Sequence, residues 1–252
     1  MLFNKSTYRG LALIFLASVS STTSFAADQP ANNFFFDYTK GHLLLELGGF
    51  YATQGKAQDI HIKTLVGNRY TVKSHAQGNG LVGVGYFLDG PERDRFKFSY
   101  GANVFFLGTT ATKGYIIEEQ LDTNLSYTYK TQNIPLFFMA KSLVQTHSDK
   151  INLAIDVGIG PNFIETSHYK EVALTTFTVP DNGFSDNNTT AFAATVGAGL
   201  RFNQVADKIP LECGYRFFYL GQGKLAKNND LIINTLKTGN NYANALICSV
   251  TI

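Results

Sequence analysis

Tryptophan is absent from this chain, and cysteine and methionine occur only twice each among its 252 residues. Without tryptophan, aromatic residues that sit at a membrane surface must be tyrosine or phenylalanine, of which there are 13 and 21. The two cysteines, Cys213 and Cys248, lie far apart and in none of the spacings typical of metal sites. The sequence predicts neither a metal site nor a bound cofactor.

An excess of charge of either sign is also lacking. The chain holds 21 basic and 19 acidic residues, and two of the basic ones, Lys5 and Arg9, lie in an N-terminal segment that we expect to be removed. The mature chain then carries 19 of each and has a net charge near zero. This balance argues against nucleic acid as a partner.

No apolar run is long enough to cross a bilayer as a helix, which needs about 20 residues. The run from Leu11 to Val19 is short, follows the basic start and precedes Ser24-Phe25-Ala26, an end of the small-x-small type. The segment 1–26 is therefore predicted to be a signal peptide, and 27–252 a single exported domain. The alternative is that this segment stays as a helix at the membrane surface.

A two-residue alternation of apolar and polar side chains is the strongest pattern in the chain. It is clearest at 151–163, where Ile151, Leu153, Ile155, Val157 and Ile159 alternate with Asn152, Ala154, Asp156, Gly158 and Gly160. Successive side chains of a strand point to opposite faces, so this segment has one wholly apolar face and one small or polar face. Eight segments of this kind are predicted, at 42–52, 80–88, 96–107, 129–143, 151–163, 191–202, 209–220 and 242–252.

The connections between these strands alternate in length, which is typical of outer-membrane barrels with long external loops and short periplasmic turns. Four long, mostly polar segments (53–79, 108–128, 164–190 and 221–241) alternate with three short turns. The sequence therefore predicts an all-β fold, an eight-stranded antiparallel up-and-down barrel that spans the outer membrane. A soluble lipocalin-like barrel would turn the apolar face inward, and the glycine-rich opposite face counts against a ligand-binding interior of that kind.

The chain resembles the eight-stranded outer-membrane β-barrel family of Gram-negative bacteria, the OmpA-like transmembrane domain group, over about 40–252. The residues that carry the resemblance are Leu-Val-Gly-Val-Gly-Tyr-Phe at 81–87, Ala-Thr-Val-Gly-Ala-Gly-Leu-Arg-Phe at 194–202 and Asn-Ile-Pro-Leu at 133–136. These motifs are generic to the group. The chain departs from the pattern by ending in Ile252 instead of an aromatic residue, and a peptidoglycan-binding role is not expected.

Seven charged residues fall on the predicted inner face. An eight-stranded barrel has an interior just wide enough for side chains, where charges must pair. Because Arg201 lies between Asp156 and Glu212 on neighbouring strands, we expect an ion-pair cluster centred on Arg201 that fills the lumen; an ion pathway is the alternative. The predicted lumen cluster is Glu46, Lys97, Lys141, Asp156, Arg201, Glu212 and Arg216.

Two further groups have alternative interpretations. Pairing of the last two strands places Cys213 opposite Cys248 on the lipid face, where they either form a disulfide or remain two small apolar residues. Ser167 and His168 lie near Glu165 in a long segment, a residue set that hydrolases use. Neighbours in an extended segment point apart, however, so the sequence predicts no catalytic residues.

The sequence thus predicts a monomeric outer-membrane protein with a structural or surface-interaction role for its long loops. The expected partners are outer-membrane lipids, lipopolysaccharide, the barrel-assembly machinery and host or other cell surfaces. Two alternatives remain open, a narrow channel for small solutes and a lipid-modifying enzyme.

Overall fold

The computed structural model describes residues 41–148, 150–205 and 209–252. The predicted signal peptide 1–26 and the segment up to residue 40 lie outside the described residues. The described residues belong to one compact unit. No helix in this part of the chain is long and apolar enough to cross a membrane.

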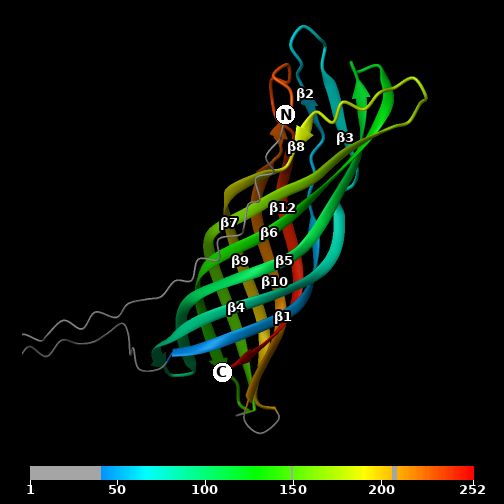
Figure 1. Ribbon diagram of the computed structural model, residues 1–252. Coiled ribbons are helices and arrows are strands. Elements are labelled where there is room, and N and C mark those ends of the chain that lie inside the picture. The colour runs from blue at the N-terminus through cyan, green and yellow to red at the C-terminus, as the bar shows by residue number, and fades with distance from the viewer. Residues whose placement is uncertain (1–40, 149, 206–208) are drawn as a thin grey trace, which may run out of the picture. The chain divides into compact units, whose positions relative to one another are not determined.

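Eight long antiparallel strands form a closed ring (Figure 1). Each strand pairs with the next long strand along the chain, and the ring closes where β1 pairs with β12. The all-β, eight-stranded up-and-down barrel predicted from the sequence is confirmed. The eight strands are β1 (Gly41–Thr53), β4 (Ala76–Arg93), β5 (Phe96–Glu118), β6 (Asp122–Gln145), β7 (Ile151–Ala173), β9 (Asn187–Val205), β10 (Ile209–Lys224) and β12 (Lys237–Thr251).

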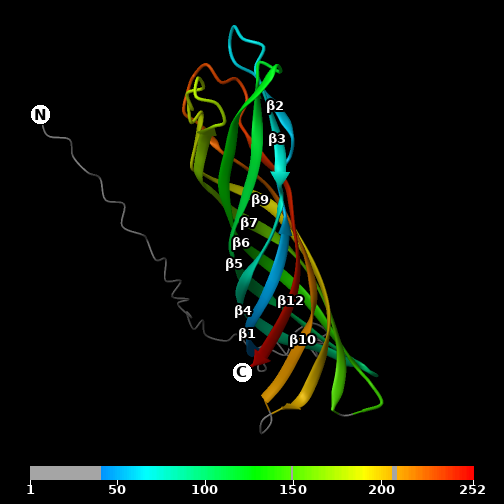
Figure 2. The same cartoon turned by 90° about the vertical axis from the view of Figure 1, so that its right-hand side faces the viewer.

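Several strands continue well beyond their predicted ends, mostly towards the long segments, although β4 also runs past its predicted end at residue 88 to Arg93, towards a short turn. The segment 108–128, predicted to be a loop, is instead the top of the β5–β6 hairpin, with Glu119 and Gln120 at positive φ in the turn. Four short strands lie in the other long segments: β2 (Gln58–Ile60), β3 (Asn68–Ser74), β8 (Phe184–Ser185) and β11 (Ala226–Lys227). β2 and β3 lie at the end of the barrel opposite to the C-terminus (Figure 2).

The outer surface of the ring carries an apolar belt. On β7 the belt runs from Leu153 to Phe163. Its outward apolar side chains are exposed apart from the half-buried Pro161, and Glu165 is the first outward charge beyond it. Between these outward positions, Ala154 and Asp156 are buried inside. A closed barrel with an exposed apolar belt and a filled interior is a transmembrane barrel of the outer-membrane type. The soluble alternative, with the apolar face inward, is therefore wrong.

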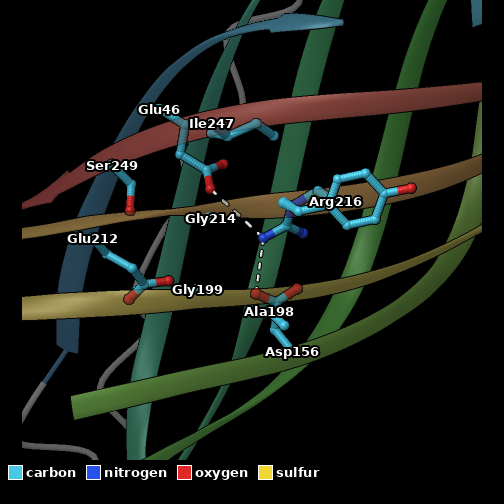
Figure 3. A pocket seen from close by; sticks show the side chains of 10 residues that line it. Glu46, Asp156, Ala198, Gly199, Glu212, Gly214, Arg216, Ile247 and Ser249 are labelled. Atoms are coloured by element: carbon cyan, nitrogen blue, oxygen red, sulfur yellow. Dashed lines mark hydrogen bonds and ion pairs between the residues drawn. The ribbon is translucent and has the colours of Figure 1, made fainter. Parts of the chain in front are cut away.

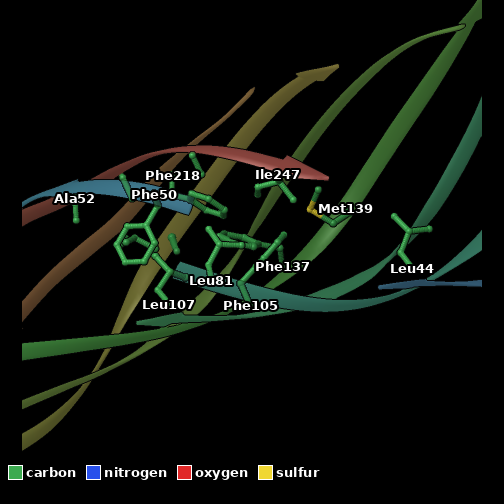
Figure 4. Close-up of a cluster of buried hydrophobic side chains, with 14 of the residues drawn as sticks. Leu44, Phe50, Ala52, Leu81, Phe105, Leu107, Phe137, Met139, Phe218 and Ile247 are labelled. Atoms are coloured by element: carbon green, nitrogen blue, oxygen red, sulfur yellow. The ribbon is translucent and has the colours of Figure 1, made fainter. Parts of the chain in front are cut away.

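Three phenylalanine rings fill the lumen at the level of the belt (Figure 4). The rings of Phe105 and Phe218 meet edge to face with centroids 5.2 Å apart, and Phe137 stacks on Phe218 at 6.0 Å. All three side chains are fully buried, and Leu81 and Leu107 pack in the same cluster. This phenylalanine layer therefore fills the lumen of the described barrel at its level.

Phe105 and Phe106 are adjacent on β5 but face the lumen and the lipid respectively, which makes them a matched pair. Phe105 is 0% exposed and Phe106 is 45% exposed. We expect Phe105→Ala to lower the free energy of unfolding by about 3–5 kcal/mol, because a cavity opens in a layer that cannot collapse around it. Phe106→Ala should cost clearly less, since lipid fills the vacated space. Urea unfolding in lipid vesicles measures both; equal losses would contradict the assigned facing.

Candidate functional site

Five of the seven predicted lumen charges lie together inside the barrel, on the short-turn side of the phenylalanine layer. They come from four strands that the ring brings around one narrow space, and each takes part in at least one ion pair. Three carboxylates meet two cationic groups in this lumen cluster, which is Glu46, Lys141, Asp156, Glu212 and Arg216.

Arg216 on β10 is the centre of the lumen cluster. Its Nη2 donates to Asp156 Oδ2 at 2.9 Å and lies 3.9 Å from Glu46 Oε1 (Figure 3). The Arg216 guanidinium also lies over the Phe105 ring, with Cζ 5.2 Å from the centroid. A buried cation needs such compensation, because its removal from water costs several kcal/mol. The arginine therefore links the ion pairs to the phenylalanine layer.

Glycine on β9 lets these two charges meet. Register places Gly197 between Asp156 on β7 and Arg216 on β10. A Cβ at Gly197 would lie 2.8 Å and 2.9 Å from the two Asp156 carboxylate oxygens. A side chain at this position would force that carboxylate to move, so the absence of one leaves the space that the ion pair occupies.

Lys141 and Glu212 form the second ion pair of the cluster. Lys141 Nζ lies 2.6 Å from Glu212 Oε2, although the register partners of these residues are Asp156 and Arg201. The long lysine side chain therefore reaches past its neighbouring strand. A cavity of about 20 Å³ borders the cluster and has room for about one water molecule.

The predicted centre of the cluster, Arg201, was wrong, and so was the placement of Lys97 within it. Arg201 is half-buried at the short-turn mouth, and no ion pair joins it to another of the described residues. Lys97 lies at the same mouth, about half exposed, and pairs with Glu92 at 3.1 Å. At the mouth a charged head group can stay hydrated, whereas Lys141 and Arg216 lie deeper and must take the buried carboxylates.

The structure joins Cys213 and Cys248 in a disulfide between β10 and β12. The two residues are direct cross-strand neighbours, with Cα atoms 4.1 Å apart, and both side chains lie on the outer face. The bond links the last two strands next to the closing β1–β12 ladder.

The four long segments pack together at the opposite end of the barrel. Ladders join 53–79 to 108–128 through β3 and β5, and 164–190 to 221–241 through β8 and β11. Gln58 Nε2 donates to the Lys237 carbonyl at 2.8 Å, which ties the first segment to the last. We call this assembly the outer platform. It encloses its own hydrophobic cluster: Ile60, Tyr70, Ile116, Leu125, Tyr127, Tyr129, Phe184, Leu225, Ile232 and Leu236.

Glu171 anchors the third long segment. Its buried carboxylate accepts backbone N–H groups of Asp181 at 3.1 Å, Asn182 at 2.9 Å and Gly183 at 3.4 Å, together with the Tyr169 hydroxyl. Hydrogen bonds to an ionised acceptor are stronger than neutral ones. The descending part of the segment is thereby held against β7 instead of projecting as a free loop.

Tyr70 and Tyr169 lie beyond the apolar belt, in the interior of the outer platform, and their hydroxyl groups are 3.3 Å apart. Burial raises the pKa of both phenols above the ordinary value of about 10, because phenolate loses its hydration there. The nearby Glu171 carboxylate raises the pKa of Tyr169 further. Both tyrosines therefore stay neutral hydrogen-bond donors over the physiological range.

Ser167 and His168 do not point apart, as the sequence predicts for an extended segment. His168 has a φ of 55°, so its ring turns back and Nδ1 lies 3.0 Å from Ser167 Oγ. Asp186 Oδ1 accepts the His168 backbone N–H instead of contacting the ring. Within the described residues, the ring has no carboxylate partner of the kind a catalytic triad uses.

The hydrophobic cluster of the outer platform was missed by the sequence reasoning, although a signal for it exists. Leu125, Tyr127 and Tyr129 alternate with Ser126 and Thr128, and the structure buries the first three. The predicted strand began only at residue 129, because the segment 108–128 as a whole is rich in threonine, glutamate and tyrosine. Because the segment is polar on average, the two-residue alternation within it was overlooked.

No protein-family model and no curated protein matches this sequence. Among solved structures, the chain is similar to outer membrane protein OprG from Pseudomonas aeruginosa, at 11% identity and a TM-score of 0.46 over 83% of this chain and 95% of that one. It is also similar to the outer membrane protease OmpT from Escherichia coli, at 8% identity and a TM-score of 0.44 over 86% and 96%. Neisserial surface protein A gives 10% identity and a TM-score of 0.39 over 83% and 96%. Similarities at this level say nothing about the activity of this chain.

The two arginines Arg216 and Arg201 allow a matched test of the lumen cluster. We expect Arg216→Met to lower the free energy of unfolding by about 3–5 kcal/mol, because it leaves Asp156 and Glu46 buried without a cation. Arg201→Met should cost about 1 kcal/mol or less, as is usual for a partly hydrated charge. Urea unfolding of both variants in the same vesicles gives the comparison. A larger loss of unfolding free energy for Arg201→Met than for Arg216→Met would contradict the account and make Arg201 the centre of the lumen cluster.

The raised pKa values of Tyr70 and Tyr169 predict loosening of the outer platform in alkali. Above pH 10 the tyrosines of an unfolded platform lose protons, while the buried ones keep theirs. The folded state then binds more protons than the unfolded state, so stability present below pH 10 falls as the pH rises further. Ultraviolet absorbance of tyrosinate, followed with limited proteolysis, should show late-titrating tyrosines and then cleavage. Titration of all tyrosines together near pH 10 would contradict this.

Proposed function

We propose that this outer-membrane barrel acts in surface interaction, as a closed anchor that presents the outer platform to other surfaces. The observation that carries the proposal is the hydrophobic cluster of the outer platform, to which all four long segments contribute side chains. Loops that merely cover a barrel need no core of their own. A binding surface benefits from such a core, because segments that are already ordered lose less conformational entropy when a partner binds.

Exposed apolar side chains on the platform support this function. Phe177 is 96% exposed, and Leu121 and Val179 are each 78% exposed; Leu121 lies in the β5–β6 turn, and Phe177 and Val179 lie in the segment after the end of β7. Large apolar groups that neither core nor lipid covers are typical of interaction sites. The proposed partners of the platform are host or other cell surfaces. Lipids and lipopolysaccharide would surround the belt of a monomer that the barrel-assembly machinery inserts.

A channel has less support than surface interaction. The phenylalanine layer fills the lumen at the belt, and the lumen cluster fills it on the short-turn side. Solute passage would require both to rearrange. A lipid-modifying enzyme has only the Ser167–His168 contact in its favour.

Cells that display the protein test the proposed role. Replacing 175–180, which includes Phe177 and Val179, by glycine and serine should reduce adhesion to cultured host cells or to neighbouring bacteria several-fold. The matched control replaces 91–94, at the tip of the β4–β5 hairpin at the other end of the barrel, and should leave adhesion unchanged. Heat-modifiable migration on gels shows that both variants are folded in the membrane.

Unchanged adhesion of the platform variant, at equal surface amounts, would contradict the proposal. Steady single-channel conductance of the wild-type protein in planar bilayers would favour the channel instead. A change in lipid A mass on expression, lost in Ser167→Ala, would favour the enzyme.

A further inference from the structure

The outer platform contains a cavity of about 640 Å³ that the proposed function does not by itself explain. Its walls come from all four long segments, so it exists only because these segments pack together. The volume lies within the range of sites that bind small ligands or a few side chains, about 300–1,000 Å³. We call this cavity the platform cup.

About half of the residues that line the platform cup are aliphatic or aromatic, and most of the others are polar or charged. Ile60 and Ile116 are buried at its base, where they belong to the hydrophobic cluster. Leu65 and Leu231 also line it, and each is more than half exposed. An occupant that covers these side chains would remove apolar surface from water, which is the main source of binding free energy.

The charges that line the platform cup are mostly acidic. Four carboxylates line it, those of Glu118, Glu171, Asp181 and Asp230, against the single ammonium of Lys227. Lys227 is already engaged, because its Nζ donates to the backbone carbonyls of Ile232 at 3.0 Å and Ile233 at 3.3 Å.

None of the four carboxylates forms an ion pair with any of the residues that the structure describes. Glu171 is satisfied by backbone N–H groups, whereas Asp181 and Asp230 are exposed at the rim. Acidic rims of this kind attract and orient cationic partners.

From the apolar wall and the acidic rim together, we infer that the platform cup binds a cationic peptide segment in which a large apolar side chain lies next to lysine or arginine. The apolar side chain would enter the cup between Leu65 and Leu231, and the basic side chains would reach Asp181, Asp230 and Glu118. The inference rests on the proposed surface interaction and names the chemistry of its partner. A purely apolar ligand would leave the carboxylates unused, and a simple cation would leave the wall exposed.

The probe for this site is a short fluorescent peptide in which lysine alternates with phenylalanine. Its binding to the full chain in nanodiscs of zwitterionic lipid is followed by fluorescence anisotropy, with empty nanodiscs subtracted. Asp181→Asn combined with Asp230→Asn should weaken binding about fivefold and reduce its dependence on salt, as expected for two exposed charges. Leu231→Ser should weaken binding by a similar factor without changing the salt dependence.

The matched control combines Asp94→Asn with Glu165→Gln, which changes the net charge equally at residues that do not line the cup. This variant should bind the peptide as the wild type does. Equal weakening in the control would overturn the inference, because binding would then reflect overall charge. Equal binding of a peptide with serine in place of phenylalanine, or its displacement by calcium ions alone, would overturn it too, by showing only cation attraction.

The two proposals fail separately. Absence of peptide binding, together with adhesion that depends on 175–180, overturns the peptide site and leaves surface interaction standing. Peptide binding that depends on Asp181 and Asp230, with adhesion unaffected by the platform variant, supports the site and overturns the adhesive role.

Discussion

The ring closes where β1 pairs with β12, and this closure leaves no free strand edge along the lipid belt. In lipid every backbone N–H and C=O must find a partner within the protein, so an open edge there would cost several kcal/mol for each unpaired group. Closure with only eight strands in turn makes the lumen narrow. The phenylalanine layer, the paired charges around Arg216 and the small residue at Gly197 are all consequences of filling that lumen.

Because the lumen is filled, a binding surface is expected beyond the belt, at the ends of the strands. Inside the belt, charges serve mainly to compensate one another, since each would be strongly unfavourable alone. Beyond the belt the same strands carry on, but their inner faces change from charged and phenylalanine-rich to tyrosine-rich, and four segments distant in sequence share one core. The barrel within the membrane and the outer platform are therefore successive parts of the same hydrogen-bonded strands.

Much of this architecture could be predicted from the sequence, because a strand with one face in lipid must alternate strictly. The inward positions of Glu46, Asp156 and Arg216 follow from that alternation. The pairing of charges across the lumen could not be predicted. Lys141 reaches beyond its register partner Asp156 to Glu212, and the order of residues does not tell how far a long side chain extends across the lumen. The left-handed φ of His168 is likewise invisible in the pattern of residues. The hydrophobic cluster of the outer platform was not predicted, because polar residues on the opposite face of the same strands made these segments look like loops.

Hydrogen–deuterium exchange of the full chain in lipid nanodiscs tests most directly whether the outer platform is an ordered continuation of the barrel. The backbone amides of 113–118 and 125–130 lie beyond the belt but within the β5–β6 ladder. They should exchange nearly as slowly as those of 153–159 within the belt, because opening them requires disruption of a buried core. Exchange at the rate of unstructured chain would show that the long segments are free loops and that no preformed binding surface exists.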